Sequence, residues 1–196
     1  MTHMEQSDET SGGVPAQARV LKNRLRHDIR SARAQRHADE RDRFATELAA
    51  WDPPPGTRRV SCFVGVGDEP DTGPLLSALS DRDIEVLLPI TLADFTLEWA
   101  LYTGEDELVH AGYGLREPTG ERLGPAALST VDIVLAPALA VDGEGRRLGQ
   151  GAGCYDRALA HVSAETPVLA IVFPSERLAE PLPEEPHDRR VDGVLP

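Results

Sequence analysis

Apolar residues recur at helical spacing early in the chain. Residues 16–50 contain no proline or glycine. Within them, apolar side chains are spaced by three and four positions: Leu21, Leu25, Ile29 and Ala32. This period predicts an amphipathic helix, or two helices in succession. The segment WDPPPG at 51–56 ends the pattern because proline cannot continue a helix. We therefore expect an N-terminal helical arm.

Short apolar runs follow the arm and predict strands at 59–64, 84–88, 97–101, 131–135 and 168–173. The run at 97–101 alternates between apolar and polar positions, which is typical of a strand with one exposed face. The other runs are nearly continuous, as in parallel strands that are covered on both faces. Helices are expected over 72–79, where Asp71 can act as the cap and a proline falls in the first turn, and over 155–161.

The order of strand, glycine-rich segment, helix and strand between 131 and 173 predicts a β-α-β unit with parallel strands. We therefore expect an α/β protein with a single three-layer α/β/α domain, a mostly parallel central sheet and the N-terminal helical arm. This domain is expected to span 15–196. The polar residues 1–14 are expected to be disordered and are left out of the fold.

The segment DGEGRRLGQGAGCYDR at 142–157 is the most informative part of the chain. Glycines stand at alternate positions there: Gly149, Gly151 and Gly153. They exclude an ordinary strand or helix and let backbone N–H groups approach a ligand. The segment follows the predicted strand 131–135, and open parallel sheets bind ligands beyond the carboxyl ends of their strands. Arg147 before the glycines and Asp156 after them would suit a polyanion with its metal ion. The alternative is a flexible surface loop with ordinary charges.

The glycine spacing matches neither G-x-x-x-x-G-K-[ST] nor G-x-G-x-x-G, so a P-loop or a dinucleotide fingerprint is not indicated. A second group of positive charges lies in the helical arm. Its members are spaced by four, four and three residues and share one helical stripe: Lys22, Arg26, Arg30 and Arg33. They could be a solvated face, partnered in part by Asp28. In a chain with a net charge of −13, the stripe is also a plausible clamp for phosphate groups.

Several carboxylates follow the predicted strands. Glu69 would lie at the ligand edge of the sheet, although it could instead cap the next helix. Three aspartates are candidate oxygen ligands for Mg²⁺, and spacing alone does not show that they converge: Asp142, Asp156 and Asp188. Cys154 and His187 could form a nucleophile and base, but no third residue to orient them is visible, so we do not favour a covalent mechanism.

Composition narrows the class of protein. The net charge of −13 argues against nucleic acid as the main partner, because neutralising phosphates needs a basic face. No apolar stretch reaches the length of a membrane span, and we expect no membrane partner. The two cysteines, Cys62 and Cys154, suggest no disulfide framework, so a cytoplasmic protein is expected. We expect it to act as a monomer on a small molecule.

Five segments together resemble the 5-formyltetrahydrofolate cyclo-ligase family, also called methenyltetrahydrofolate synthetases. The longest is PALAVDGEGRRLGQGAGCYDR at 137–157, which is similar to the family pattern P-x-x-A-x-D-x-x-G-x-R-L-G-x-G-x-G-x-Y-D-R. The others are KNRLR at 22–26, EPDT at 69–72, YGLREP at 113–118 and LP-x-x-x-HD at 182–188. The resemblance runs from about residue 19 to 195. It implies a Rossmann-like domain of the NagB/RpiA/CoA-transferase type.

The resemblance also implies an activity. The family cyclises 5-formyltetrahydrofolate to 5,10-methenyltetrahydrofolate with ATP and Mg²⁺, through phosphoryl transfer to the formyl oxygen, and releases ADP and phosphate. Lys22 and Arg147 would be catalytic, and Asp156 and Asp188 would bind Mg²⁺. ATP would contact two segments: Lys22, Asn23, Arg24, Leu25 and Arg26, and Arg147, Leu148, Gly149, Gln150, Gly151, Ala152, Gly153, Cys154 and Tyr155. The folate would contact Val64, Glu69, Gln150, Gly151, Ala152, Gly153 and Cys154.

One position in the glycine segment departs from the family pattern. Members usually carry an aromatic residue where Cys154 stands. This difference leaves two alternatives open. The protein could be a divergent paralogue that acts on another formamide-like metabolite, or it could bind reduced folate without catalysis. The presence of the full set of candidate phosphate and metal ligands favours an enzyme.

Overall fold

The computed structural model describes residues 13–185 and 188–196. Within these residues, one sheet has six strands in the order β11-β9-β6-β1-β2-β3. Neighbouring strands run parallel except for β3, which pairs antiparallel with β2 at one edge. Their bounds are β1 (Arg59–Ser61), β2 (Glu85–Thr91), β3 (Leu97–Leu101), β6 (Ile133–Pro137), β9 (Val168–Ile171) and β11 (Gly193–Leu195). The prediction of a mostly parallel sheet is confirmed.

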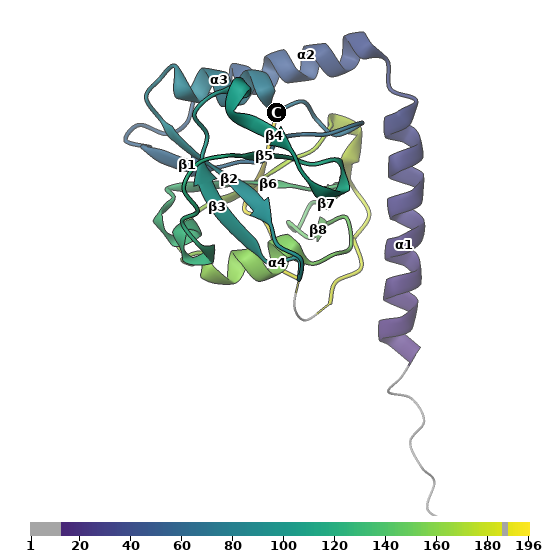
Figure 1. Ribbon diagram of the computed structural model, residues 1–196. Helices are drawn as coiled ribbons and strands as arrows, with labels where there is room; N and C mark the ends of the chain where they lie inside the picture. Colours follow the sequence, from purple (N-terminus) through teal and green to yellow (C-terminus); the bar gives the residue numbers. More distant parts are fainter. Residues whose placement is uncertain (1–12, 186–187) are drawn as a thin grey trace, which may run out of the picture.

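Helices cover both faces of this sheet (Figure 1). On one face, α2 (Ala38–Ala49) and α3 (Gly73–Ser80) pack in a core with Ile133 and Leu135 of β6. On the other face, α4 (Cys154–Ala158) and the short 3-10 helices η3 (Pro125–Thr130) and η4 (Leu159–His161) pack with Val134 and Ala136 of the same strand. Because successive side chains of a strand point to opposite faces, a strand that is buried on both sides must be apolar throughout. The predicted three-layer arrangement is therefore confirmed.

Helix α1 (Gly13–Ala34) stands beside the domain as an arm (Figure 1). The predicted helical stretch is thus two helices, α1 and α2. Leu25 and Ile29 of α1 pack against a small cluster on the domain: Leu139, Ala140, Leu148 and Leu182. The predicted disorder of residues 1–14 falls almost entirely outside the described residues. Among the described residues, no helix combines the length and the apolar character that crossing a bilayer requires.

The sequence pattern missed the small elements. A second sheet joins β10 (Arg177–Leu178), β7 (Ala140–Asp142) and β8 (Arg147–Leu148), and a hairpin pairs β4 (Leu108–His110) with β5 (Arg116–Pro118). The remaining 3-10 turns are η1 (Glu105–Glu107), η2 (Gly112–Gly114) and η5 (Pro174–Glu176). The glycines at 149–153 therefore follow the β7-β8 hairpin. The sequence had predicted that this segment would follow the strand at 131–135 directly. The helix predicted over 155–161 is shorter and continues as a 3-10 turn.

The predicted strand at 59–64 is shorter because its last residues bond to the start of α3. The Thr72 hydroxyl donates a hydrogen bond to the Phe63 carbonyl (2.6 Å) and accepts one from the Gly65 N–H (3.0 Å). Thr72, and not Asp71, is the N-cap residue of α3. Asp71 instead accepts a hydrogen bond from the Gly73 N–H (2.9 Å). The chain after β1 is consequently held as a fixed turn.

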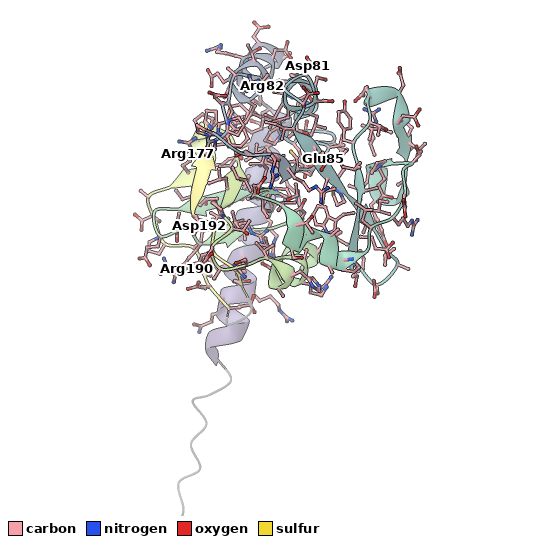
Figure 2. All side chains as sticks on the ribbon, turned by 90° about the vertical axis from the view of Figure 1, so that its left-hand side faces the viewer. Asp81, Arg82, Glu85, Arg177, Arg190 and Asp192 are labelled. Carbon is pink, nitrogen blue, oxygen red and sulfur yellow. The ribbon has the colours of Figure 1, made fainter. Side chains whose placement is uncertain are left out.

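The order of the strands defines one crevice. From β1 the chain builds outward through β2 to β3, then returns to the other side of β1 as β6 and continues outward to β9 and β11. In open α/β sheets, ligands bind beyond the carboxyl ends of the strands at such a reversal. Figure 2 views the molecule from the side away from α1, where Glu85 begins β2 and Asp192 directly precedes β11. The carboxyl ends of the strands therefore face α1.

Candidate functional site

A cavity of about 680 Å³ lies at the carboxyl ends of β1 and β6. Phe63 and Val64, which follow β1, line it together with Pro137 and Ala138 from β6 and its exit. Helix α1 contributes the whole basic stripe: Lys22, Arg26, Arg30 and Arg33. The glycine segment 149–156 forms another wall. This volume is in the range of sites that bind small molecules.

Lys22 is the only lysine of the chain, and it is 4 % exposed. Its Nζ donates to the carboxylates of Glu185 (2.8 Å) and Asp188 (2.5 Å) from the C-terminal segment. Burial acts to lower the pKa of Lys22, but the hydrogen bonds to Asp188 and Glu185 outweigh it and the pKa is raised. The ammonium group is therefore fully charged at neutral pH and lies at the cavity wall.

Arg26 meets the glycine segment directly. Its Nε donates to the Gly149 carbonyl (2.9 Å), and its Nη1 donates to the Asn23 amide oxygen (2.7 Å). A Cβ atom at Gly151 would lie 3.4 Å from Arg26 Cζ, and the backbone there has φ +110°, which side chains rarely adopt. Burial, followed by the charge of Arg30, lowers the pKa of Arg26. The backbone conformation therefore favours glycine at position 151, and a Cβ there would lie in van der Waals contact with the guanidinium group.

Arg24 and Leu25 are not among the residues that line the cavity, and their assignment to ATP binding stays a prediction. The Arg24 side chain is 80 % exposed and lies 3.9 Å from Asp28 on its own helix. Leu25 packs against the apolar cluster under α1. At helical spacing, neighbours of Lys22 and Arg26 necessarily point to other sides of α1. Asn23 contacts Arg26 through the hydrogen bond to its amide oxygen.

Arg33 is used to attach α1. It is 3 % exposed and makes a bidentate ion pair with Glu176, while its Nη2 also donates to the Ala138 carbonyl (2.8 Å). Arg30 instead contacts Gln150 in the glycine segment. The interpretation of the stripe as a solvated face is wrong for Lys22 and Arg33, because both are buried. Sequence reasoning did not identify Glu176, which lies 143 positions away from Arg33.

Arg147 lies under the glycine segment with its side chain almost completely buried. It forms an ion pair with Asp156 in the first turn of α4. Its Nε is buried and has no hydrogen-bond partner within the described residues. A buried donor without a partner costs free energy unless a ligand or water accepts from it. The guanidinium group can thus hold Asp156 and still donate toward an anion.

Asp142 is structural, so its candidacy as a metal ligand is wrong. Its carboxylate accepts hydrogen bonds from the backbone N–H groups of Glu144 (2.9 Å), Arg146 (3.0 Å) and Leu182 (2.8 Å). Burial acts to raise the pKa of Asp142, but these bonds, led by that from Leu182, lower it overall. The aspartate closes the turn of the β7-β8 hairpin and attaches the C-terminal segment to it. By contrast, Asp156 and Asp188 both line the cavity.

Glu69 contacts the glycine segment from the turn between β1 and α3. One carboxylate oxygen accepts a hydrogen bond from Gln150 Nε2 (3.0 Å) and the other from the Val66 N–H (3.3 Å). Glu69 does not cap α3, since Thr72 has that position. Val64 and Glu69 both line the cavity. Glu69 thus lies at the ligand edge of the sheet, as its position after a predicted strand indicated.

Two exposed aromatic side chains at the cavity were not predicted as site residues. The rings of Phe95 and Tyr113 lie 5.6 Å apart, and both residues have left-handed backbone, with φ +63° and +62°. Arg157 donates to the Phe95 carbonyl (2.9 Å) and to the Ala152 carbonyl (3.1 Å), so it joins this turn to the glycine segment. Tyr113 belongs to a motif in the sequence, whereas no sequence signal marked Phe95.

A family model described as the 5-formyltetrahydrofolate cyclo-ligase family matches residues 15–196. The chain belongs to this family. A cyclo-ligase of Mycolicibacterium smegmatis is 43 % identical over 143 residues, which cover 70 % of this chain and 73 % of that protein. A mouse cyclo-ligase is 23 % identical over 192 residues, which cover 93 % and 94 %. An Escherichia coli cyclo-ligase is 30 % identical over 138 residues, which cover 69 % and 75 %.

Solved structures agree with the cyclo-ligase family. The NMR structure of Aquifex aeolicus 5,10-methenyltetrahydrofolate synthetase has a TM-score of 0.75 and 27 % identity, with 89 % of each chain covered. The corresponding synthetase of Mycoplasma pneumoniae has a TM-score of 0.69 at 18 % identity, with 89 % of this chain and 97 % of that chain covered, and it shows the same fold.

Cys154 of the cyclo-ligase chain is not primed as a nucleophile. Burial raises the pKa of the Cys154 thiol, which disfavours the reactive thiolate. His187, its proposed partner, lies outside the described residues. The hydroxyl of the neighbouring Tyr155 is buried without a hydrogen-bond partner among the described residues, and burial raises its pKa well above the ordinary value. Neutral cysteine and tyrosine side chains therefore border the glycine segment.

Proposed function

We propose that this protein cyclises 5-formyltetrahydrofolate to 5,10-methenyltetrahydrofolate and converts ATP to ADP and phosphate. Membership of the cyclo-ligase family supports the overall reaction. One observation carries the proposal for the site. The glycine segment binds the basic helix α1 through Gly149 and Arg26, and it binds the acidic side of the cavity through Gln150 and Glu69. A nucleotide and a neutral heterocycle can therefore meet across the same few glycines.

The reaction needs a better leaving group than the formyl oxygen. This oxygen attacks the γ-phosphorus of ATP, and ADP leaves. The formyl carbon is then bonded to a phosphorylated oxygen and accepts attack from N10. N10 loses its proton, the oxygen departs as phosphate, and the five-membered ring is closed as the methenyl cation. Phosphoryl transfer of this kind is catalysed chiefly by positioning and by neutralising charge. No nucleophile from the protein is required.

Three cations suit the phosphate side. Lys22 and Arg147 would contact the transferred phosphoryl group as the catalytic cations, and Arg26 would hold the other phosphates. All three line the cavity and are held by partners, so little reorganisation is needed as charge develops. Gly151 and Gly153 have positive φ and no Cβ, which leaves the backbone open to an anion. The buried Nε of Arg147 supports this role because it has a hydrogen bond left to donate.

The carboxylates fit a magnesium ion. Asp156 and Asp188 are hard oxygen donors that line the cavity. No cluster of three or more acidic, histidine or cysteine side chains is poised for a metal among the described residues. Mg²⁺ commonly takes only one or two carboxylates and completes its shell with water and phosphate oxygens. Once bound, the ion would neutralise negative charge on the phosphates. Asp156 and Asp188 would orient it, while Arg147 and Lys22 hold these two carboxylates in place.

On the substrate side, Glu69 would accept hydrogen bonds from N–H groups of the pterin ring or the formamide. Val64, Cys154 and the backbone of 150–154 would contact the same molecule. The Phe95–Tyr113 pair offers aromatic surface for a flat ring at the cavity.

A divergent substrate is the second candidate, and Cys154 is the observation that favours it. The family usually has an aromatic residue at this position, and the half-buried thiol lines the same cavity. A smaller side chain leaves room for another formamide-like group. A protein that only binds folate is disfavoured, because such a protein has no use for Lys22, Arg147 and the two aspartates together.

One assay separates these functions. The purified protein is incubated with Mg-ATP and 5-formyltetrahydrofolate, and methenyl absorbance and phosphate release are followed together. We expect both signals in equal amounts. Phosphate release without the methenyl product would favour the divergent substrate. Tight folate binding without either signal would favour a binding protein, and either result would refute the proposed activity.

A further inference from the structure

Arg30, Gln150 and Glu69 all line the cavity and form a continuous chain of hydrogen bonds. Arg30 donates to Gln150 Oε1 from Nη2 (2.7 Å) and Nε (3.1 Å), and to the Gln150 carbonyl from Nη2 (3.1 Å). Gln150 Nε2 then donates to Glu69 Oε1 (3.0 Å), and the Val66 N–H holds the other carboxylate oxygen (3.3 Å). The chain joins α1, the glycine segment and the turn after β1, which are far apart in sequence.

The chemistry of the three side chains fixes the direction of this bridge. A guanidinium group can only donate hydrogen bonds, and a carboxylate can only accept them. The amide of Gln150 is the one member that does both, so its oxygen must face Arg30 and its nitrogen must face Glu69. A carboxylate at position 150 would repel Glu69, and an apolar side chain would break both connections. The amide therefore connects the carboxylate of Glu69 to a side chain of α1.

The bridge is suited to orienting side chains, and it adds little to the stability of the fold. Arg30 and Gln150 are exposed, so water competes for each hydrogen bond. The stable attachment of α1 is made elsewhere, by the buried Arg33–Glu176 pair. Arg30 also lies one helical turn beyond Arg26, which contacts the same glycine segment at Gly149. A shift of the segment would therefore reach Glu69 through Gln150.

We propose that Arg30 and Gln150 are positioning residues that orient Glu69 for the folate and make its orientation depend on the docking of α1. This inference rests on the proposed function, because it assigns Glu69 to the substrate side and α1 to the nucleotide side. The basic stripe suggested that Arg30 belongs to a clamp for phosphate groups. The inference assigns Arg30 to the substrate side instead. Two of the three guanidinium nitrogens donate to Gln150, whereas the Asp156 and Asp188 side chains accept hydrogen bonds from Arg147 and Lys22, respectively.

The test uses Arg30→Met and Gln150→Met in the full-length protein. Each has a control with the same chemical change at an exposed position, namely Arg19→Met in α1 and Gln35→Met directly after it. Initial rates are measured with 5-formyltetrahydrofolate varied at saturating Mg-ATP, and then with Mg-ATP varied at saturating folate. Equilibrium binding of 5-formyltetrahydrofolate is titrated without ATP. Melting temperatures show whether the fold is affected.

We expect each bridge variant to raise the KM and Kd for the folate about tenfold, the size of one charge-assisted hydrogen bond. The KM for Mg-ATP should change less than about twofold, and the melting temperature less than about 2 °C. The double variant Arg30→Met/Gln150→Met should have the same KM and Kd for the folate as either single variant, because both substitutions break the same chain of hydrogen bonds. The two controls should match the wild type.

Three results would overturn the proposal. The first is an unchanged folate KM and Kd in Gln150→Met. The second is a selective rise of the Mg-ATP KM in Arg30→Met, which would return Arg30 to the phosphates. The third is an additive double variant. Failure of the proposed function looks different. A wild-type protein that binds the folate without forming methenyl product would refute the activity while the titrations still test the bridge, and a wild type that does not bind it would refute both.

Discussion

The buried guanidinium group of Arg33 binds the carboxylate of Glu176 through two parallel hydrogen bonds, of 2.8 Å and 2.7 Å. The side chains are 3 % and 4 % exposed. Glu176 also accepts a hydrogen bond from the Phe173 N–H (3.0 Å), and the guanidinium lies 5.7 Å from the centre of the Phe173 ring. This pair joins the arm that carries Lys22 and Arg26 to η5, the 3-10 turn that follows β9. The positions of Lys22 and Arg26 therefore depend on an ion pair that is not one of the proposed phosphate contacts.

We expect Glu176→Ala to destabilise the protein by about 3–5 kcal/mol, because it leaves a buried guanidinium without its counter-charge. The free energy of unfolding is measured by urea titration. Glu165→Ala, at an exposed position, is the matched control and should change this free energy by less than about 0.5 kcal/mol. Equal costs for the two variants would show that the buried pair does not anchor α1.

Because of Lys22, we expect the free energy of unfolding to fall at alkaline pH. Burial opposes protonation of Lys22, but the hydrogen bonds to Asp188 and Glu185 prevail and raise its pKa above the ordinary 10.5. The folded protein thus binds this proton more tightly than the unfolded chain does. The stabilisation is fully present below the unfolded pKa and is lost as the pH rises through the higher folded pKa.

The measurement compares wild type with Lys22→Met in urea titrations at increasing alkaline pH. The difference in unfolding free energy should be constant up to about pH 10 and shrink above it. Because the chain has a single lysine, no other lysine contributes to this change. A difference that stays constant through the alkaline range would contradict the raised pKa.

Arg147→Met tests the proposed catalytic cation. We expect kcat/KM for cyclisation to fall by about 10²–10³-fold, as when one preorganised donor to a developing charge is removed. Far-ultraviolet circular dichroism checks that the fold survives. Arg122→Met, an exposed arginine paired with Glu98 away from the cavity, serves as the control and should retain full activity. A wild-type kcat/KM in Arg147→Met would exclude Arg147 from the phosphoryl-transfer step.

Gly151→Ala tests the close approach of Arg26 to the glycine segment. The alanine would have to adopt a backbone conformation at φ +110°, and its Cβ would contact the guanidinium group of Arg26. We expect a loss of about 1–3 kcal/mol in stability from backbone strain. We also expect a higher KM for Mg-ATP, because relief of this strain would shift the glycine segment relative to Arg26. Gly143→Ala is the control, since a Cβ there meets open space and its φ lies outside the strained region. Indistinguishable kinetics for the two variants would show that Gly151 is not needed for this contact.

The fold could be predicted where the pattern was long. The arm was recognisable because apolar residues repeat over several turns, and the strand at 97–101 was located correctly, although Trp99 and Ala100 are both buried and its alternation is therefore incomplete. Strands β7, β8 and β10 have two or three residues, too few to show a period. They form because each finds a partner in the small sheet. A tertiary contact also explains why β1 is shorter than predicted, because the residues that follow it bond to Thr72.

The sequence by itself determined which residue types could handle phosphate, metal and folate, and their spacing along the helix and the glycine segment. It identified the family through motifs that are local. Only the tertiary structure decided which partner each side chain has. Arg33 turned to Glu176, Asp142 to the hairpin turn, and Arg30 to Gln150. Spacing cannot reveal such pairs, because their members come from segments that meet only when the sheet, the arm and the C-terminal segment have packed together.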